Sequence, residues 1–201
     1  MNKIILKGTI RDIQPSHVVK DTEYDKADLI VPGKDGNEDL ITIKFKKYSN
    51  VYQEGQIVSL KGNIRSYSKK LEDGKSKVDI YVFTYFDIPE TDEEDREIEN
   101  RFEVDGRICK IDKLRTDKNG KDSLHFILAN NIFVEGGANK IDTYIPCVCF
   151  GELAKQHQDL AVGDFVTLRG RLHSRTYKKY LDNEEMEIRM AHEAVIEYME
   201  W

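Results

Sequence analysis

Hydrophobic and polar residues alternate with a period of two along short stretches of the chain, a pattern typical of strands with one buried and one solvent-facing side. From Val58 to Arg65 every second residue is apolar or glycine, and the same alternation runs from Val166 to His173. Comparable patterns predict further strands elsewhere in the chain. These strands are expected at about residues 4–13, 24–32, 40–48, 78–87, 102–112, 123–133, 143–150 and 185–195.

An internal repeat relates the two halves of the chain. Residues 55–70 (GQIVSLKGNIRSYSKK) match residues 163–178 (GDFVTLRGRLHSRTYK) at an offset of 108. A period of about one hundred residues indicates tandem domains and not a solenoid of short repeats. The identical residues include the pairs Gly55/Gly163, Gly62/Gly170 and Ser66/Ser174. Because Gly62 and Gly170 fall on the inward side of their strands, we expect a sharp bend or a bulge at both positions.

Each half contains five predicted strands, and the second half adds a short helical pattern. In residues 151–164 (GELAKQHQDLAVGD), apolar residues recur at helical spacing after the third strand. Five strands with one helix after the third is the plan of the OB-fold, a partly open Greek-key barrel. The sequence therefore predicts an all-β fold: two tandem OB-fold five-stranded Greek-key barrels, each with at most one short helix. The end of the chain from Ala191 fits either a continued strand or a helix.

Charge is distributed unevenly along the chain, whose formal net charge is −6. Residues 89–100 (PETDEEDREIEN) contain seven acidic residues and one arginine without hydrophobic periodicity, which indicates a solvated connection. We therefore expect domain one at residues 1–88, an acidic linker at 89–100 and domain two at 101–201. Because charges nearly balance outside the tract, the overall acidity does not exclude a nucleic-acid partner.

Composition excludes several other classes of protein. No segment approaches the roughly 18 apolar residues of a transmembrane helix, and the first residues lack the apolar core of a signal peptide. We therefore expect a cytoplasmic protein without a membrane partner. Three cysteines without a CxxC pair argue against a disulfide framework and against a thiolate zinc site.

No motif in the sequence indicates catalysis. Phosphate-binding loops, zinc-protease HExxH, dinucleotide-binding glycine fingerprints and GxSxG elbows are absent, and the five histidines are scattered. Cys147 and Cys149 share one face of a predicted strand, where small apolar core residues are a commoner interpretation than a redox pair. We therefore expect no enzyme, no metal site and no cofactor.

Positively charged and aromatic residues share the outward faces of the predicted strands. Cations suit phosphates and flat rings suit unstacked bases, so this combination favours a groove for a single nucleic-acid strand. The alternative is that the cations only keep the protein soluble, while the rings pack between domains or subunits. The candidates in domain one are Lys61, Arg65, Tyr67, Lys69, Tyr81 and Phe83, with Lys70 and Tyr85 beside them. The candidates in domain two are Arg169, Arg171, His173, Arg175, Tyr177, Lys178 and Lys179.

The segment YIPCVCFGELAKQHQDLAVGDFVTLRGRLHSRTYKK, which begins at Tyr144, resembles the bacterial and phage single-stranded DNA-binding protein family. The shared pattern is an aromatic, a hydrophobic run ending in Phe-Gly-x-Leu-Ala, a helix, a Gly-x-x-Val strand and a basic stretch ending in an aromatic. The stretch SLHFILANN from Ser123 also resembles the family's second strand. The resemblance covers about residues 105–190 and implies that Tyr144, Phe150 and Tyr177 stack on bases.

Domain one is assigned mainly through the internal repeat and departs from the family pattern. Phe45 aligns with Phe150 and is the matching stacking candidate, whereas Asp39 and Lys69 occupy the places of Tyr144 and Tyr177. The alternative role for domain one is assembly instead of DNA contact.

The resemblance implies non-catalytic, largely sequence-independent binding of single-stranded DNA in replication, recombination or repair. Because many family members assemble four OB-folds, we expect a homodimer, with other replication proteins as candidate partners. Three alternatives stay open at this point. The first is an OB-fold adaptor that docks on a replication or primosome protein with only weak nucleic-acid contact. The others are an RNA-binding OB module and an OB-type nuclease, for which we find no clustered metal-binding carboxylates.

Overall fold

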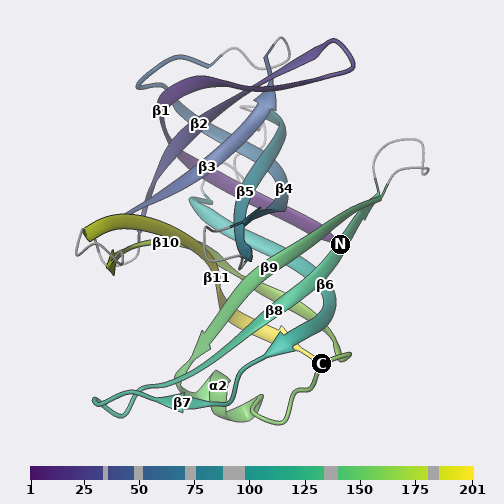
Figure 1. Ribbon diagram of the computed structural model, residues 1–201, viewed down its shortest axis with the longest axis vertical. Coiled ribbons are helices and arrows are strands. Elements are labelled where there is room, and N and C mark those ends of the chain that lie inside the picture. Colours follow the sequence, from purple (N-terminus) through teal and green to yellow (C-terminus); the bar gives the residue numbers. More distant parts are fainter. Residues whose placement is uncertain (34–35, 48–51, 71–75, 88–97, 134–139, 181–185) are drawn as a thin grey trace.

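The computed structural model describes residues 1–33, 36–47, 52–70, 76–87, 98–133, 140–180 and 186–201. Two groups of strands follow the internal repeat (Figure 1). The first group is β1 (Asn2–Val19), β2 (Thr22–Pro32), β3 (Glu38–Lys46), β4 (Ile57–Lys70) and β5 (Ser76–Asp87). The second group is β6 (Asn100–Ile111), β7 (Arg115–Thr116), β8 (Asp122–Phe133), β9 (Lys140–Phe150), α2 (Gly151–Gln156), β10 (Phe165–Tyr180) and β11 (Met186–Glu200).

Each group closes into a barrel with the same strand order. Barrel one runs β2–β3–β5–β4–β1 and returns from β1 to β2, whereas barrel two runs β6–β10–β11–β9–β8 and returns from β8 to β6. Most neighbours are antiparallel, but β3 pairs with β5, and β9 with β11, in parallel. This is the five-stranded Greek-key arrangement of the OB-fold. The prediction of two tandem OB-fold barrels in an all-β chain is confirmed.

The two barrels share one continuous sheet because β1 of barrel one pairs with β6 of barrel two. Five antiparallel register pairs run from Asn2↔Val104 to Leu6↔Asn100. Ile4 and Phe102 face each other in the middle of this pair and are fully buried, so one hydrophobic core extends through both barrels. In Figure 1 barrel one lies above barrel two, β8 and β9 rise at the right toward the level of barrel one, and β10 and β11 extend to the left beneath it.

Two asparagines secure this joint at equivalent places. The Asn2 side chain accepts a hydrogen bond from Ile64 N–H and donates one to Ile64 O, both at 2.9 Å. The Asn100 side chain makes the same two bonds with Leu172, which stands at the repeat position of Ile64. Each amide thus satisfies backbone groups that a longer partner strand would otherwise pair.

The identities of the repeat have structural reasons. Gly55 and Gly163 adopt positive φ angles of 77° and 104°, and their N–H groups bond Ile10 O and Ile108 O. Each inward glycine, Gly62 or Gly170, follows a register shift between β4 and β5 or between β10 and β11, which confirms the predicted bulges. A Cβ at Gly170 would lie 2.0 Å from Val195 O, so only glycine fits there.

The predicted elements are present, with some differences in length. β1 continues to Val19, and the ambiguous end of the chain belongs to β11. The helix keeps only six residues, and β7 was not anticipated. Asn100, which was assigned to the linker, opens β6 because its side chain and backbone join the β1–β6 seam. Most of the linker proposed at residues 89–100 lies outside the described residues, which resume at residue 98, so the division into domains at 1–88, 89–100 and 101–201 stays a prediction.

Replacing Gly170 with alanine should lower the free energy of unfolding by about 2–3 kcal/mol, because the added methyl group forces apart two paired strands. Equilibrium unfolding in urea measures this loss. Gly120→Asn is the control, since a Cβ there has no neighbour within 4 Å and asparagine tolerates a φ of 78°. Identical midpoints for Gly170→Ala and the unmodified chain would contradict the close approach.

Candidate nucleic-acid interface

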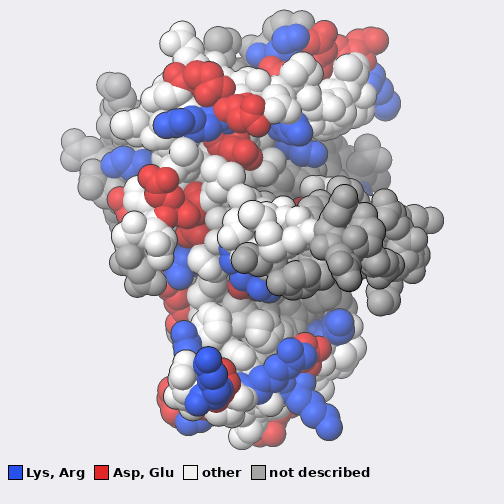
Figure 2. All heavy atoms as spheres, turned by 60° about the vertical axis from the view of Figure 1, so that its left-hand side comes forward, with Lys and Arg blue, Asp and Glu red and all other residues white. Residues whose placement is uncertain are grey.

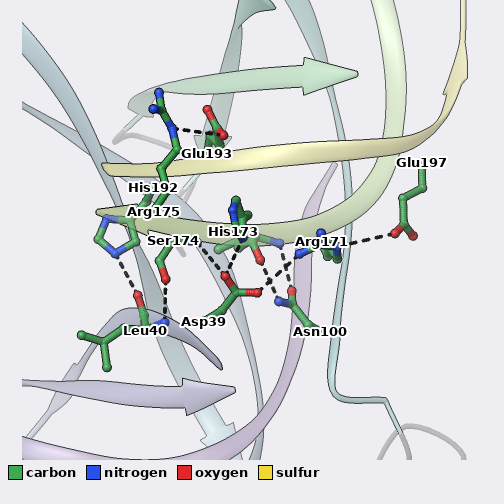
Figure 3. A network of polar contacts seen from close by, with 11 residues as sticks. Asp39, Leu40, Asn100, Arg171, His173, Ser174, Arg175, His192, Glu193 and Glu197 are labelled. Atoms are coloured by element: carbon green, nitrogen blue, oxygen red, sulfur yellow. Dashed lines mark hydrogen bonds and ion pairs between the residues drawn. The ribbon is translucent and has the colours of Figure 1, made fainter. Parts of the chain in front are cut away.

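A buried carboxylate joins β3 of barrel one to β10 of barrel two (Figure 3). Asp39 is only 3% exposed, and its Oδ1 accepts hydrogen bonds from His173 Nδ1 at 2.7 Å and from Ser174 N–H at 2.8 Å. Its Oδ2 lies 3.4 Å from a guanidinium nitrogen of Arg171. A buried carboxylate is costly unless it is paired and hydrogen-bonded, so these contacts favour one relative position of the barrels.

The repeated serines also connect the two barrels. Ser174 Oγ accepts a hydrogen bond from Leu40 N–H of barrel one at 2.8 Å. In the opposite direction, Ser66 Oγ accepts one from Tyr144 N–H of barrel two, also at 2.8 Å. The Ser66/Ser174 identity of the repeat therefore reflects a pair of reciprocal contacts between the barrels.

His192 on β11 adds a third connection to barrel one. Its Nδ1 lies 3.0 Å from Asp79 Oδ1 and its Nε2 lies 3.0 Å from Leu40 O. Burial opposes ionisation of Asp79, but the hydrogen bond and charge of His192, the Ile80 N–H and the charge of Lys77 outweigh it and hold the pKa of that carboxyl below its usual value. The contact therefore stabilises the carboxylate form of Asp79 at neutral pH.

The cationic strip predicted along β10 is largely occupied by contacts within the chain. Arg169 pairs with Glu103 at 2.8 Å, and Arg175 pairs with Glu193 at 3.4 Å. Arg171 lies between Asp39 and Glu197, and His173 also contacts Asp39. Tyr177 is half-buried, and its hydroxyl accepts a hydrogen bond from Lys77 Nζ at 3.0 Å. Arg171, His173 and Tyr177 contact barrel one, so the expectation that they line an open cationic groove is corrected. The side chains of Lys178 and Lys179 lie outside the described residues.

Two rings of barrel two that the family resemblance indicated are accessible. Tyr144 on β9 is 42% exposed and Phe150 at the end of β9 is 36% exposed. Lys121 Nζ lies 4.4 Å from the centre of the Phe150 ring, which is a cation–π distance. Tyr144 and Phe150 therefore remain predicted base-stacking residues.

A basic end of barrel two was not anticipated from the sequence. Figure 2 shows lysine and arginine side chains at the lower end of the molecule, where β7 and α2 lie in Figure 1. Positions 110–121 contain five basic residues, but these residues do not alternate with apolar ones as in a strand, so the sequence reasoning did not identify them as a surface. The basic residues of this part of the chain are Lys110, Lys113, Arg115, Lys118, Lys121 and Lys155. Of these, Arg115 pairs with Asp112 and Lys155 with Asp122.

Barrel one carries a continuous surface of rings and cations, which we call the ring face. Its strands are neighbours in the barrel, and its side chains point outward from all five of them. Three of its members, Tyr81, Phe83 and Tyr85, alternate along β5 at intervals of about 6.7 Å. The ring face consists of His17, Tyr24, Lys44, Arg65, Tyr67, Tyr81, Phe83 and Tyr85.

The members of the ring face contact one another from strand to strand. His17 stacks on Tyr24 with the ring centres 4.7 Å apart, and Tyr24 lies 6.0 Å from Phe83. The guanidinium of Arg65 lies 3.8 Å from the centre of the Phe83 ring. Lys44 Nζ lies 4.2 Å from the centre of Tyr81 and 5.4 Å from that of Tyr67.

The ring face includes four predicted residues, Arg65, Tyr67, Tyr81 and Phe83, and three that the sequence reasoning missed, His17, Tyr24 and Lys44. Phe45 was wrongly assigned as a base-stacking candidate, because its side chain is buried in the core against Tyr52. Lys61 is half-buried on the outward side of β4, and the side chain of Lys69 lies outside the described residues.

Other chemistry is sparse in the part of the chain that the structure describes. Burial raises the pKa of the Cys149 thiol to about 11 and also raises that of Cys147, so neither is a ready nucleophile. No three described His, Cys, Asp or Glu side chains gather as a metal site requires. No described helix has the length and apolar character needed to cross a bilayer.

The fold and its exposed rings define an OB-fold protein with surfaces suited to a polymeric ligand. Residues 99–199 match the model of the Single-strand binding protein family, and the chain belongs to that family. Its fold is similar to that of a deletion variant of the single-stranded DNA binding protein from Thermus aquaticus, with a TM-score of 0.69 and 16% identity over 100% of this chain and 93% of that one. The wild-type Thermus protein matches with the same score and identity over 100% and 92%. A search of curated proteins found no match.

Replacing Asp39 with alanine should destabilise the protein by about 2–3 kcal/mol, because the change leaves buried donors on β10 without an acceptor. Thermal and urea unfolding measure the loss. Asp142→Ala is the matched control, since that exposed carboxylate pairs only at the surface with Lys140 and should cost less than about 1 kcal/mol. Equal losses for both variants would contradict the role assigned to Asp39.

Proposed function

We propose that the chain binds single-stranded DNA without catalysis and largely without regard to sequence. Membership of the single-strand binding protein family supports single-stranded DNA as the ligand. The observation that carries the proposal is the combination of exposed rings with adjacent cations. Cations neutralise phosphates, while each ring stacks on a base. Because every base has a π-face, stacking tolerates any sequence.

The two barrels allow one chain to cover a substantial length of DNA. OB-folds cover roughly 4–16 nucleotides each, so two of them accommodate up to about 30. We propose that the chain coats exposed single strands in replication, recombination or repair, with other replication proteins as candidate partners. This role needs no cofactor.

We further propose a homodimer that supplies four OB-folds. Ile57 and Phe165 stand at equivalent positions of the repeat, on the outward sides of β4 and β10, and are 71% and 52% exposed. The strand register places them at opposite ends of the β4–β1–β6–β10 face, and large apolar side chains that are this exposed are candidates for burial in an association surface. The joint β4–β1–β6–β10 face would then pack against its copy.

Binding to oligo-dT should weaken steeply with salt, because phosphate contacts release counterions. If four to eight phosphates are neutralised, the slope of log K against log salt should be about −3 to −6. Fluorescence quenching across a salt series measures this slope. A slope near zero would contradict a cationic groove.

The same titration separates the alternatives. Only millimolar affinity for dT, together with a tight protein partner in a pull-down, favours the adaptor. Tighter binding of oligo-U than of oligo-dT of equal length favours an RNA-binding module. Shortening of a labelled oligomer in the presence of magnesium or calcium favours a nuclease.

The double substitution Ile57→Glu and Phe165→Glu should convert the proposed dimer into a monomer, since four buried carboxylates per dimer would strongly oppose association. Light scattering coupled to gel filtration measures the mass, which should fall to 23.3 kDa. Val162→Glu, at another exposed apolar residue outside these strands, is the control. A monomeric unmodified chain would contradict the proposed dimer directly.

A further inference from the structure

The rings of barrel one contact one another, whereas no described ring of barrel two makes a ring–ring contact. Ring and cation–π contacts join the members of the ring face into two groups that lie side by side on β5. The first group is His17, Tyr24, Arg65, Phe83 and Tyr85, and the second is Lys44, Tyr67 and Tyr81. Tyr67 and Tyr85 are 45% and 41% exposed within it, so bases have direct access to rings whose neighbours hold them in place. Aromatic platforms of this kind bind successive bases of a single strand.

The charge of the ring face is positive at its centre. Lys44 lies directly across from Lys26 in the β2–β3 register, and like charges in such pairs are destabilising. Lys44 forms no ion pair with a carboxylate among the described residues, and its ammonium group lies over two tyrosine rings. Fold stability alone would favour an acidic residue opposite Lys26, so this arrangement suits an anionic ligand.

The ionisation of the neighbouring groups agrees with this charge distribution. Burial and the charge of Lys26 lower the pKa of Lys44, and burial and the charge of Lys44 lower the pKa of His17. Arg65 adds a further cation, and its Nε is buried without a hydrogen-bond partner among the described residues. The carboxylate of Asp79 at the edge of the ring face contacts Tyr67 and His192.

Barrel two uses the corresponding strand differently. The arginines along β10 pair with Glu103, Asp39 and Glu193, and Tyr177 contacts Lys77 of barrel one. The exposed rings Tyr144 and Phe150 have no ring–ring contact with each other or with another described residue, and the lysines near Phe150 belong to the basic end. Barrel two thus offers charge at one end and exposed rings that make no ring–ring contact among the described residues, namely Tyr144, Phe150, Phe165, Tyr198 and Trp201.

We propose that the ring face of barrel one is the principal base-stacking surface of the chain, an inference that rests on the proposed binding of single-stranded DNA. It lies outside residues 99–199, the part that matches the family model. Barrel two contributes phosphate contacts from its basic end and holds barrel one through β10 and β11.

Two matched pairs of substitutions test this division. Tyr67→Ala with Tyr85→Ala removes two exposed rings from barrel one, and Tyr144→Ala with Phe150→Ala removes two rings of similar exposure from barrel two. Alanine substitution of a stacking ring costs about 1–3 kcal/mol per base, so the first pair should weaken binding of dT of about 30 nucleotides by roughly 30-fold or more. The second pair should weaken it less than about fivefold.

The outcomes separate this inference from the proposed function. If the unmodified chain does not bind dT, both are wrong. If the unmodified chain binds and the barrel-two pair loses as much affinity as the barrel-one pair, or more, only the inference is wrong. Tyr67→Phe with Tyr85→Phe should recover most of the affinity that the alanine pair loses, because the rings return without the hydroxyl groups.

A second measurement needs no variant and so does not depend on the folding of one. Ultraviolet cross-linking of the unmodified chain to oligonucleotides containing 5-iodouridine should label peptides of β1, β2, β4 and β5. Cross-links confined to the peptides of Tyr144 and Phe150 would overturn the inference. Lys44→Gln should in addition reduce the salt slope by about 0.7, the contribution of one phosphate contact.

Discussion

The antiparallel pairing of β1 with β6 determines how every other part of the molecule is placed. It aligns two barrels that would otherwise be independent, and it buries Ile4 and Phe102 in a core common to both. The amide side chains of Asn2 and Asn100 extend the hydrogen bonding just beyond its two ends. With this seam fixed, the β10/β11 hairpin reaches barrel one, and Asp39 meets its donors at hydrogen-bond distance.

The two copies of the repeat show how one backbone supports two uses. Its glycines and apolar residues perform the same task in both barrels, because turns, bulges and cores follow from the barrel itself. The outward residues are not bound by that constraint and have diverged. On β10, Arg169 and Arg175 pair with carboxylates of barrel two, while Arg171 and His173 contact Asp39 of barrel one. On β4 and β5 the outward residues form the ring face instead.

The fold could be predicted from the sequence because alternation with a period of two is a property of neighbouring residues, and the repeat is a comparison of two stretches of the same chain. The site could be predicted only in part. Phe45 aligns with Phe150, yet its strand turns it into the core. Arg171 faces outward as expected, but barrel one covers it. Its contact with Asp39 joins residues that are 132 positions apart, so no pattern of neighbouring residues indicates it. His17 joins the ring face through Tyr24, its partner across the β1–β2 hairpin, and Lys44 joins it only when β3 pairs with β5 to close the barrel.

Each barrel closes through a parallel pair of strands with only two residue pairs in register, far fewer than in its hairpins. In barrel one these positions are Ile43↔Val82 and Lys44↔Phe83, and the second pair belongs to the ring face. A polynucleotide bound there would contact both strands of the shortest pairing in the barrel, β3 with β5. Ligands that bind only the closed form stabilise it, so the weakest closure of the fold is also the one that an occupied surface reinforces.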